Sequence, residues 1–289
     1  RQTLISGFIR KCSANKVMTL AELLKSIFLG IVQGLTEFLP ISSSAHLNIF
    51  PWLFKWDSIP DSFDLALHIG TLFSILIFFY KDWIALIKGG YKTVVKKEKN
   101  TNGRLFWLIV FATIPAGVLG LVFEKIVGKL VNNNLNIEMI VISAALIIMG
   151  VILYIVDKNA KSTVSYKKMP AKSALAIGTS QALAAAIPGV SRSGITITVS
   201  RACGLDRESA AKYSFLLSAP IVAAAALVKI NDFSFDMQFF AGVLASFISG
   251  MLVIKFLMGF VKNRSYKVFA VYRVIFGLFI LAVAIIRMF

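Results

Sequence analysis

Six apolar runs of membrane-spanning length limit the fold more than any other feature of this sequence. They are Phe63–Tyr80, Leu105–Phe123, Ile137–Ile155, Tyr213–Val228, Phe239–Phe260 and Val268–Met288. At 1.5 Å per helical residue, such runs cross a hydrocarbon core of roughly 30 Å, the shorter ones only just. Hydrophobic residues fill 57% of the 289 positions and the mean hydropathy is +0.79, which excludes an ordinary soluble domain. The sequence predicts an all-α polytopic membrane protein with six transmembrane helices.

Two further apolar regions, Leu20–Phe54 and Ala174–Cys203, are each broken near the middle. The first break is Pro40-Ile41 followed by three serines, and the second begins at Pro188-Gly189. Each side of a break is too short to span a bilayer. Irregular backbone at membrane depth is tolerated only where protein or water surrounds it. We therefore expect two re-entrant helical hairpins.

The two broken regions are related by an internal repeat. A gap-free offset of 148 residues pairs Gly30 with Gly178, Gln33 with Gln181, Leu35 with Leu183, Pro40 with Pro188 and Ser43 with Ser191. Each unit is one hairpin followed by three spans, and an odd number of spans inverts the second unit. We expect an inverted-topology repeat in a single membrane domain, residues 18–289, with unit one at 20–155 and unit two at 173–289. Residues 1–17 are interpreted as an unpatterned N-terminal extension.

Basic residues set the expected orientation. The net charge is +17, and the segments Lys81–Arg104 and Asp157–Lys172 hold seven Lys/Arg and five Lys. With the basic residues at 262–267, these loops are predicted to be cytoplasmic, and the alternate loops external. The basic loops are too short for a nucleic-acid-binding domain, so no nucleic-acid partner is expected. Cys12 and Cys203 lack the spacing of a disulfide framework or a zinc site.

The first break carries most of the chemistry. Glu37 is the only acidic residue deep in an apolar stretch, where a charge costs roughly 2.5–3.5 kcal/mol or more, so a functional role is expected. Gln33 lies on the same helical face. Of the three serines 42–44, one is enough to cap the following helix. His46 is interpreted as a base or nucleophile, and His68, inside a plain span, as an ordinary core residue.

The second break, Ser191-Arg192-Ser193-Gly194, opens a returning helix. Free N–H groups and the helix dipole favour an anion there, and the fork of Arg192 suits phosphate oxygens better than a lysine would. The alternative is that Glu37 neutralises Arg192 without any ligand.

These residues resemble a known family. Val32–His46 is similar to the first signature of the bacterial undecaprenyl-diphosphate phosphatases of the bacitracin-resistance type, and Pro188–Thr196 to their second. Tyr272-Arg273 also looks familial. The resemblance covers Met18 to Phe289 and implies hydrolysis of undecaprenyl diphosphate, which recycles the lipid carrier of cell-wall synthesis. It also implies a divalent metal ion (Mg²⁺ or Ca²⁺), a bacterial plasma membrane location and a site open to the outside.

The expected site follows from both arguments. Catalytic roles are predicted for Glu37, Ser43, His46 and Arg192, with Glu37 as the metal ligand, and substrate binding for Gln33, Ser42, Gly189, Ser191, Ser193, Gly194 and Thr196. The nucleophile is left open among Ser43, His46 and water.

Many members of the family that this chain resembles carry Glu at the position of Gln33. The expected partners are the polyprenyl diphosphate and membrane lipid, with a homodimer left open. The alternative function is a polyprenyl-phosphate transporter or flippase, since inverted repeats with broken helices are a common transporter plan.

Overall fold

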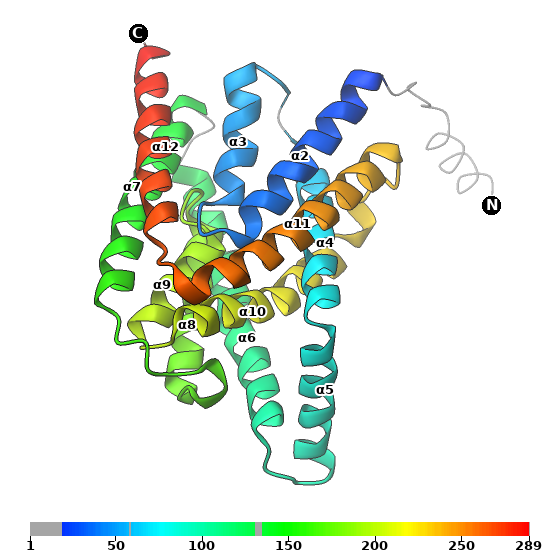
Figure 1. The fold of residues 1–289 in the computed structure, drawn as a ribbon. Coiled ribbons are helices and arrows are strands. Elements are labelled where there is room, and N and C mark those ends of the chain that lie inside the picture. Colours follow the sequence, from blue (N-terminus) through cyan, green and yellow to red (C-terminus); the bar gives the residue numbers. More distant parts are fainter. Residues whose placement is uncertain (1–18, 58, 131–134, 289) are drawn as a thin grey trace, which may run out of the picture.

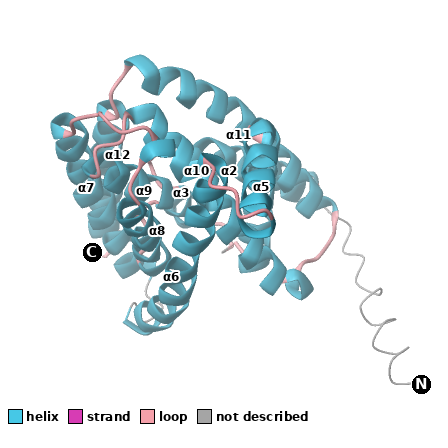
Figure 2. Ribbon diagram, turned by 90° about the horizontal axis from the view of Figure 1, so that it is seen from below, coloured by secondary structure: helices cyan, strands magenta, loops and turns pink. Residues whose placement is uncertain are grey.

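The computed structural model describes residues 19–57, 59–130 and 135–288, and the extension at residues 1–17 lies outside them. Within these ranges the chain forms eleven α-helices and two short 3-10 helices, joined by loops (Figures 1 and 2). The α-helices are α2 (Leu20–Phe38), α3 (Ser43–Phe54), α4 (Asp61–Phe78), α5 (Tyr80–Val95), α6 (Thr101–Leu130), α7 (Leu135–Asn159), α8 (Ala171–Ala186), α9 (Arg192–Ala202), α10 (Arg207–Val228), α11 (Met237–Asn263) and α12 (Lys267–Ile286). The 3-10 helices are η1 (Tyr166–Lys168) and η2 (Ile230–Asp232).

Six of the described helices are long and apolar enough to cross a membrane. They are α4, α6 over Thr101–Gly120, α7, α10, α11 and α12. Each predicted span falls on one of them, so the all-helical fold and the number of spans are confirmed. Large apolar side chains such as Phe73, Ile148 and Leu252 are exposed on these helices, as expected where the solvent is lipid.

Helix α5 corrects the sequence prediction, which placed a loop at Lys81–Arg104. Its segment is too charged to span a membrane, yet it has an apolar side that includes the buried Leu86. A Cβ on Gly89 would meet the Gly103 nitrogen at 2.6 Å, so α5 and α6 approach very closely. Close backbone packing therefore stabilises a helix where charge alone suggested a loop.

Both breaks have the same local structure. Proline two residues beyond α2 and α8 ends each helix, because proline has no N–H to continue it. Ser42 and Ser191 then cap the next helix: each has a positive φ (78° and 71°), and its hydroxyl accepts from the backbone N–H three residues later. The caps are therefore Ser42 and Ser191, and the predicted pairing of Ser43 with Ser191 is wrong by one residue. The second break is one residue longer, and Gly189 there has a φ of +93°.

The two halves of the chain pack against each other through small residues. A Cβ on Gly30 of α2 would lie 2.5 Å from the Gly242 oxygen of α11, and one on Gly178 of α8 would lie 2.5 Å from the Ala112 Cβ of α6. The first helix of each half thus lies along a spanning helix of the other half. Small residues permit this close approach in membrane helices.

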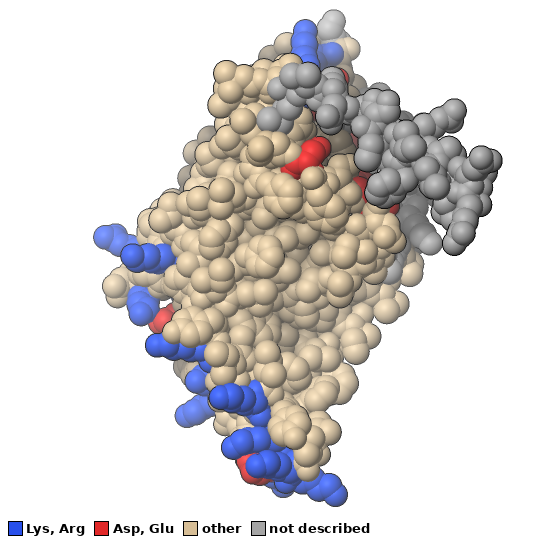
Figure 3. Space-filling model, turned by 90° about the vertical axis from the view of Figure 1, so that its right-hand side faces the viewer, with Lys and Arg blue, Asp and Glu red and all other residues tan. Residues whose placement is uncertain are grey.

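Charge separates the two ends of the molecule. Figure 3 shows Lys and Arg mostly along the lower end of the molecule, with mainly uncharged residues, some Asp or Glu and few Lys or Arg above them. In Figure 1 the loop between α5 and α6 lies at this lower end, and the C-terminus lies at the upper end.

Candidate active site

Glu37 lies at the centre of a polar cluster at the end of α2. Its side chain is 5% exposed, and one carboxylate oxygen accepts from Arg192 while the other accepts from Ser43. The Arg192 Nη2–Oε1 and Ser43 Oγ–Oε2 distances are both 2.5 Å. Gln33, one turn earlier on α2, also donates to Oε2, at 3.2 Å. One buried carboxylate therefore joins the two breaks directly.

The two side chains that meet at Glu37 come from equivalent positions. Ser43 is the first residue of α3 and Arg192 the first residue of α9, each directly after its capping serine. Both units also share a hydroxyl–hydroxyl contact after the break. The hydroxyl oxygens of Ser42 and Ser44 lie 3.3 Å apart, and so do those of Ser191 and Ser193. One unit thus supplies a hydroxyl to Glu37, and the other a guanidinium.

Arg273 on α12 holds the backbone of both breaks. Its guanidinium is fully buried and donates to the carbonyls of Pro40, Gly189 and Val190 at 2.9–3.2 Å. A Cβ on Gly194 would lie 2.6 Å from its Nη1, so glycine is needed there. The sequence marked Arg273 only by resemblance. Its partners are carbonyl groups, which a sequence does not reveal.

His68 on α4 also belongs to the cluster, and its interpretation as an ordinary core residue is wrong. Its Nδ1 lies 2.9 Å from the Gln33 amide nitrogen and 3.6 Å from Oε1 of Glu37. Its Nε2 lies 3.9 Å from the half-exposed Asp64. An available signal was the spacing of Asp64 and His68, which share one helical face four residues apart.

His46 is bound elsewhere. Its Nδ1 lies 2.7 Å from the Ser42 carbonyl and its Nε2 2.7 Å from the Tyr272 hydroxyl, and its ring stacks on Phe276. The carbonyl can only accept, so Nδ1 carries the proton, and Nε2 accepts from the tyrosine. The structure therefore engages both nitrogens of His46 away from Glu37. Its role as base or nucleophile stays a prediction.

The other predicted binding residues lie around the breaks. The Thr196 hydroxyl donates to the Arg192 carbonyl and contacts Ser214, and the Ser193 hydroxyl donates to the Leu39 carbonyl. The protein itself therefore already occupies these hydroxyl groups. Two other buried atoms of the cluster, Arg192 Nη1 and Gln33 Oε1, have no hydrogen-bond partner within the described residues. A buried donor or acceptor without a partner costs about 1–3 kcal/mol, so these two atoms are suited to meet a ligand.

Metal-binding capacity rests on few oxygens. Over the described part of the chain, no group of three or more His, Cys, Asp or Glu is placed to hold a metal ion. The cluster offers the Glu37 carboxylate and the unpartnered Gln33 oxygen. Hard cations such as Mg²⁺ are commonly held by one or two carboxylates, with water and substrate phosphates completing the shell. These residues therefore fit a cation that arrives with a phosphate, rather than a closed protein cage.

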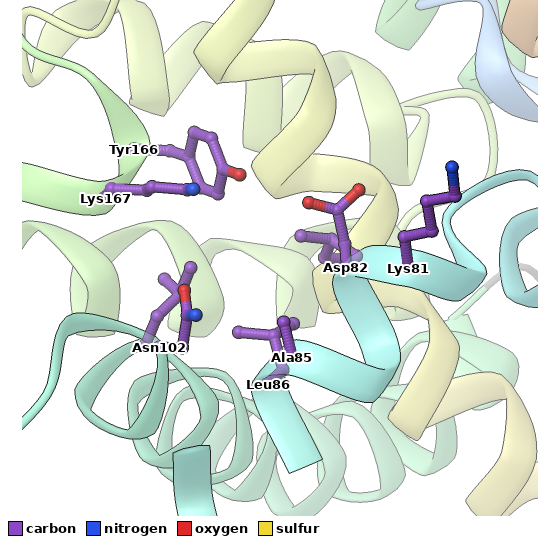
Figure 4. Close-up of a pocket in the computed structure, with 9 residues that line it drawn as sticks. Lys81, Asp82, Ala85, Leu86, Asn102, Tyr166 and Lys167 are labelled. Atoms are coloured by element: carbon purple, nitrogen blue, oxygen red, sulfur yellow. The ribbon is translucent and has the colours of Figure 1, made fainter. Parts of the chain in front are cut away.

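A separate cavity of about 140 Å³ lies between α5, α6 and η1 (Figure 4). In that view the Asp82 carboxylate and Tyr166 hydroxyl point toward each other, and Lys81 points away. Asp82 forms an ion pair with Lys212 at 2.7 Å, and that ammonium lies 5.4 Å from the centre of the Tyr166 ring. The lining charges are thus partly neutralised by the protein itself, and none of the Glu37 cluster lines this cavity.

Comparison with known proteins identifies the family. The model of the family described as bacitracin resistance protein BacA matches residues 26–279. The chain belongs to this family. The undecaprenyl-diphosphatase of Caldicellulosiruptor bescii is 46% identical over 268 residues, covering 91% of this chain and 98% of its own. Those of Desulforudis audaxviator (43% over 266 residues, 91% and 98% covered) and Myxococcus xanthus (39% over 268 residues, 90% and 88%) are also similar. Membership of the BacA family and the six apolar helices make the chain a multi-pass membrane protein.

Proposed function

We propose that this chain hydrolyses undecaprenyl diphosphate to undecaprenyl phosphate and inorganic phosphate. One observation carries the proposal within a family of such phosphatases: Glu37 binds a hydroxyl and a guanidinium from the two breaks, and Arg192 Nη1 has no partner among the described residues. A phosphate oxygen at Nη1 would satisfy that donor. Phosphoryl transfer depends mainly on positioning and charge stabilisation, which this cluster supplies.

Ser43 is the nucleophile that the geometry favours. Its hydroxyl already donates to Glu37 Oε2, so Glu37 can take the proton as Oγ attacks the terminal phosphorus. An Oγ–P bond forms and the bond from phosphorus to the bridging oxygen breaks, so undecaprenyl phosphate leaves with that electron pair. Water then attacks the phosphoserine, inorganic phosphate leaves, and Ser43 regains a proton.

Arg192 stabilises the transferred group throughout. Its Nη2 stays on Glu37 while Nη1 binds an oxygen of the terminal phosphate, so one guanidinium aligns base and substrate. A divalent cation held by Glu37 and the Gln33 oxygen would supply further charge neutralisation when bound. That metal role stays part of the proposal.

The membrane arrangement belongs to the same proposal. The returning helices α3 and α9 have 12 and 11 residues, too few to span a bilayer, which supports re-entrant hairpins. Each hairpin is followed by three spanning helices, which supports an inverted repeat within one membrane domain. Close to the cluster, His68 is 23% and Asp64 44% exposed. Asp64 lies in the first turn of α4, the end opposite the basic loops, so substrate would enter from outside the cell.

Phosphate release in detergent tests the proposal. Purified protein in micelles is given undecaprenyl diphosphate, and inorganic phosphate is measured over time. Micelles have no two compartments, so a lipid transporter would release none. We expect turnover in the wild type and a loss of about 10³-fold in Ser43→Ala, since removal of a nucleophile costs at least this much.

Ser44→Ala is the matched control, because Ser44 is exposed and its side-chain hydrogen bond among the described residues is to the Ser42 hydroxyl alone. It should keep near-normal turnover. A wild type without phosphate release would refute the phosphatase function. An active Ser43→Ala would instead exclude Ser43 and leave the attack to water or His46.

A further inference from the structure

The amide of Gln33 bridges two acceptors. Its nitrogen lies 2.9 Å from His68 Nδ1 and 3.2 Å from Glu37 Oε2, and the side chain is fully buried. An amide nitrogen has two hydrogens and cannot accept, so one hydrogen goes to each partner. With the amide in this orientation, Nδ1 of a neutral His68 accepts from Gln33, and the ring proton lies on Nε2.

The orientation of this amide matters for Glu37. With its nitrogen toward Oε2, Gln33 and Ser43 both donate to the same carboxylate oxygen. A flipped amide would place its oxygen against Oε2, and two acceptors repel each other. It would also replace the unpartnered Oε1 in the cluster with a donor.

We propose that His68 is a positioning residue of this site, whose Nδ1 acceptor holds the Gln33 amide in the orientation that aims Glu37 Oε2 at Ser43. The proposal rests on the phosphatase function proposed above. Apart from Glu37 itself, His68 is the one hydrogen-bond partner of this amide among the described residues, because the Gln33 Oε1 has none. His68 itself is anchored by α4, where its carbonyl accepts from Thr71 at 2.9 Å.

The proposal requires a hydrogen-bond acceptor in the side chain of residue 68. His68→Leu keeps the bulk but removes the acceptor, and kcat should fall about 10–100-fold, as is usual when a group that orients a site residue is lost. KM should change less than about threefold, because the imidazole positions Gln33 rather than the substrate. His68→Asn places a carbonyl oxygen near the Nδ1 position, so it should recover most of kcat.

The proposal also requires that the effects of His68 and Gln33 on kcat be coupled. Gln33→Met removes the bridging amide and should lower kcat by a similar factor. If the two residues act through one hydrogen bond, the double variant Gln33→Met/His68→Leu should be within about threefold of the slower single variant. Independent roles would instead multiply the two losses.

The experiment measures kcat and KM for phosphate release in micelles, with melting temperature as a folding check. Thr113→Val on α6 is the matched control, because the Thr113 hydroxyl donates to the Ile109 carbonyl of its own helix, and it should keep wild-type kcat. His68→Ala replaces His68→Leu in the comparison if the latter does not fold. A wild-type kcat in His68→Leu, a loss confined to KM, a His68→Asn as slow as His68→Leu, or multiplicative losses would each overturn the positioning role. Failure of the phosphatase function is distinct, because it would show as no turnover in the wild type.

Discussion

Two buried carboxylates, Glu37 and Asp157, each bind arginine, yet their surroundings differ. Asp157 accepts from Arg201 Nε at 2.8 Å and from Arg207 Nε at 2.9 Å, and its other oxygen accepts from the Tyr266 backbone. Arg201 also donates to the carbonyls of Asp157 and Leu205. By contrast, the Glu37 cluster leaves a guanidinium nitrogen and an amide oxygen without partners in the described part of the chain. Complete satisfaction indicates a structural role, and incomplete satisfaction indicates a place for a ligand.

The Asp157 cluster has a clear structural task. It joins the end of α7 to the end of α9 and the start of α10, and the Tyr266 hydroxyl adds a bond to the Arg207 carbonyl. Burial, and less strongly the nearby Asp157, raise the pKa of Tyr266, so its hydroxyl stays a neutral donor. The returning helix of the first unit has a similar tie: Arg287, just after α12, donates to the Trp52 and Leu53 carbonyls at the end of α3. Each returning helix is therefore tied by the last helix of the other unit.

The largest effect is expected at Glu37. Glu37→Gln removes the group that accepts the Ser43 proton and the negative charge beside Arg192, so kcat should fall about 10³–10⁴-fold. Steady-state phosphate release in micelles measures this, with the melting temperature as a control for folding. A folded variant with wild-type turnover would move Glu37 into the same structural class as Asp157.

Asp157→Asn should show the opposite pattern. Arg201 is fully buried, so removing its counter-charge leaves an uncompensated charge and should lower the free energy of unfolding by about 3 kcal/mol. Turnover per folded molecule should stay near wild type, because the hydrogen bonds and ion pairs of Asp157 among the described residues involve none of the residues around Glu37. Denaturation in detergent and kcat from the folded fraction provide the two measurements. A large loss of kcat without loss of stability would break the comparison.

Arg192→Lys tests geometry at constant charge. A lysine has no planar fork, so it cannot bind Glu37 and a phosphate oxygen through two fixed nitrogens. We expect kcat/KM to fall about 10²-fold, comparable to the loss of one donor to the transition state. Equal turnover in the folded lysine variant would mean that Arg192 supplies charge alone.

Much of this architecture could be predicted from the sequence, and the exceptions have physical causes. Hydropathy and proline located the six spans and both breaks, because each depends on local composition. His68 was missed because its contact with Gln33 depends on how α4 is rotated against α2, which hydropathy does not determine. The equivalence of the breaks was off by one residue, because the second break has one residue more between its proline and its capping serine, and a gap-free offset cannot align both. For the site, pairing of Glu37 with Arg192 was one of the stated alternatives, whereas the use of both His46 nitrogens by Ser42 and Tyr272 was not.

The smallest effect is expected at the two capping serines, which lie beside the site but are satisfied by the protein. Ser191 accepts from the Gly194 N–H, so Ser191→Ala should cost about 1 kcal/mol of stability through the lost cap. Ser191→Gly should cost less, because glycine tolerates the φ of 71° and loses only a few tenths of a kcal/mol as a cap. The same order, alanine worse than glycine, should hold at Ser42, whose φ is 78°. Thermal unfolding of the four variants tests this, and kcat is measured beside it. A loss of activity larger than the loss of stability explains, in alanine and glycine alike, would place that hydroxyl with Arg192 and Gln33 among the groups that meet the ligand.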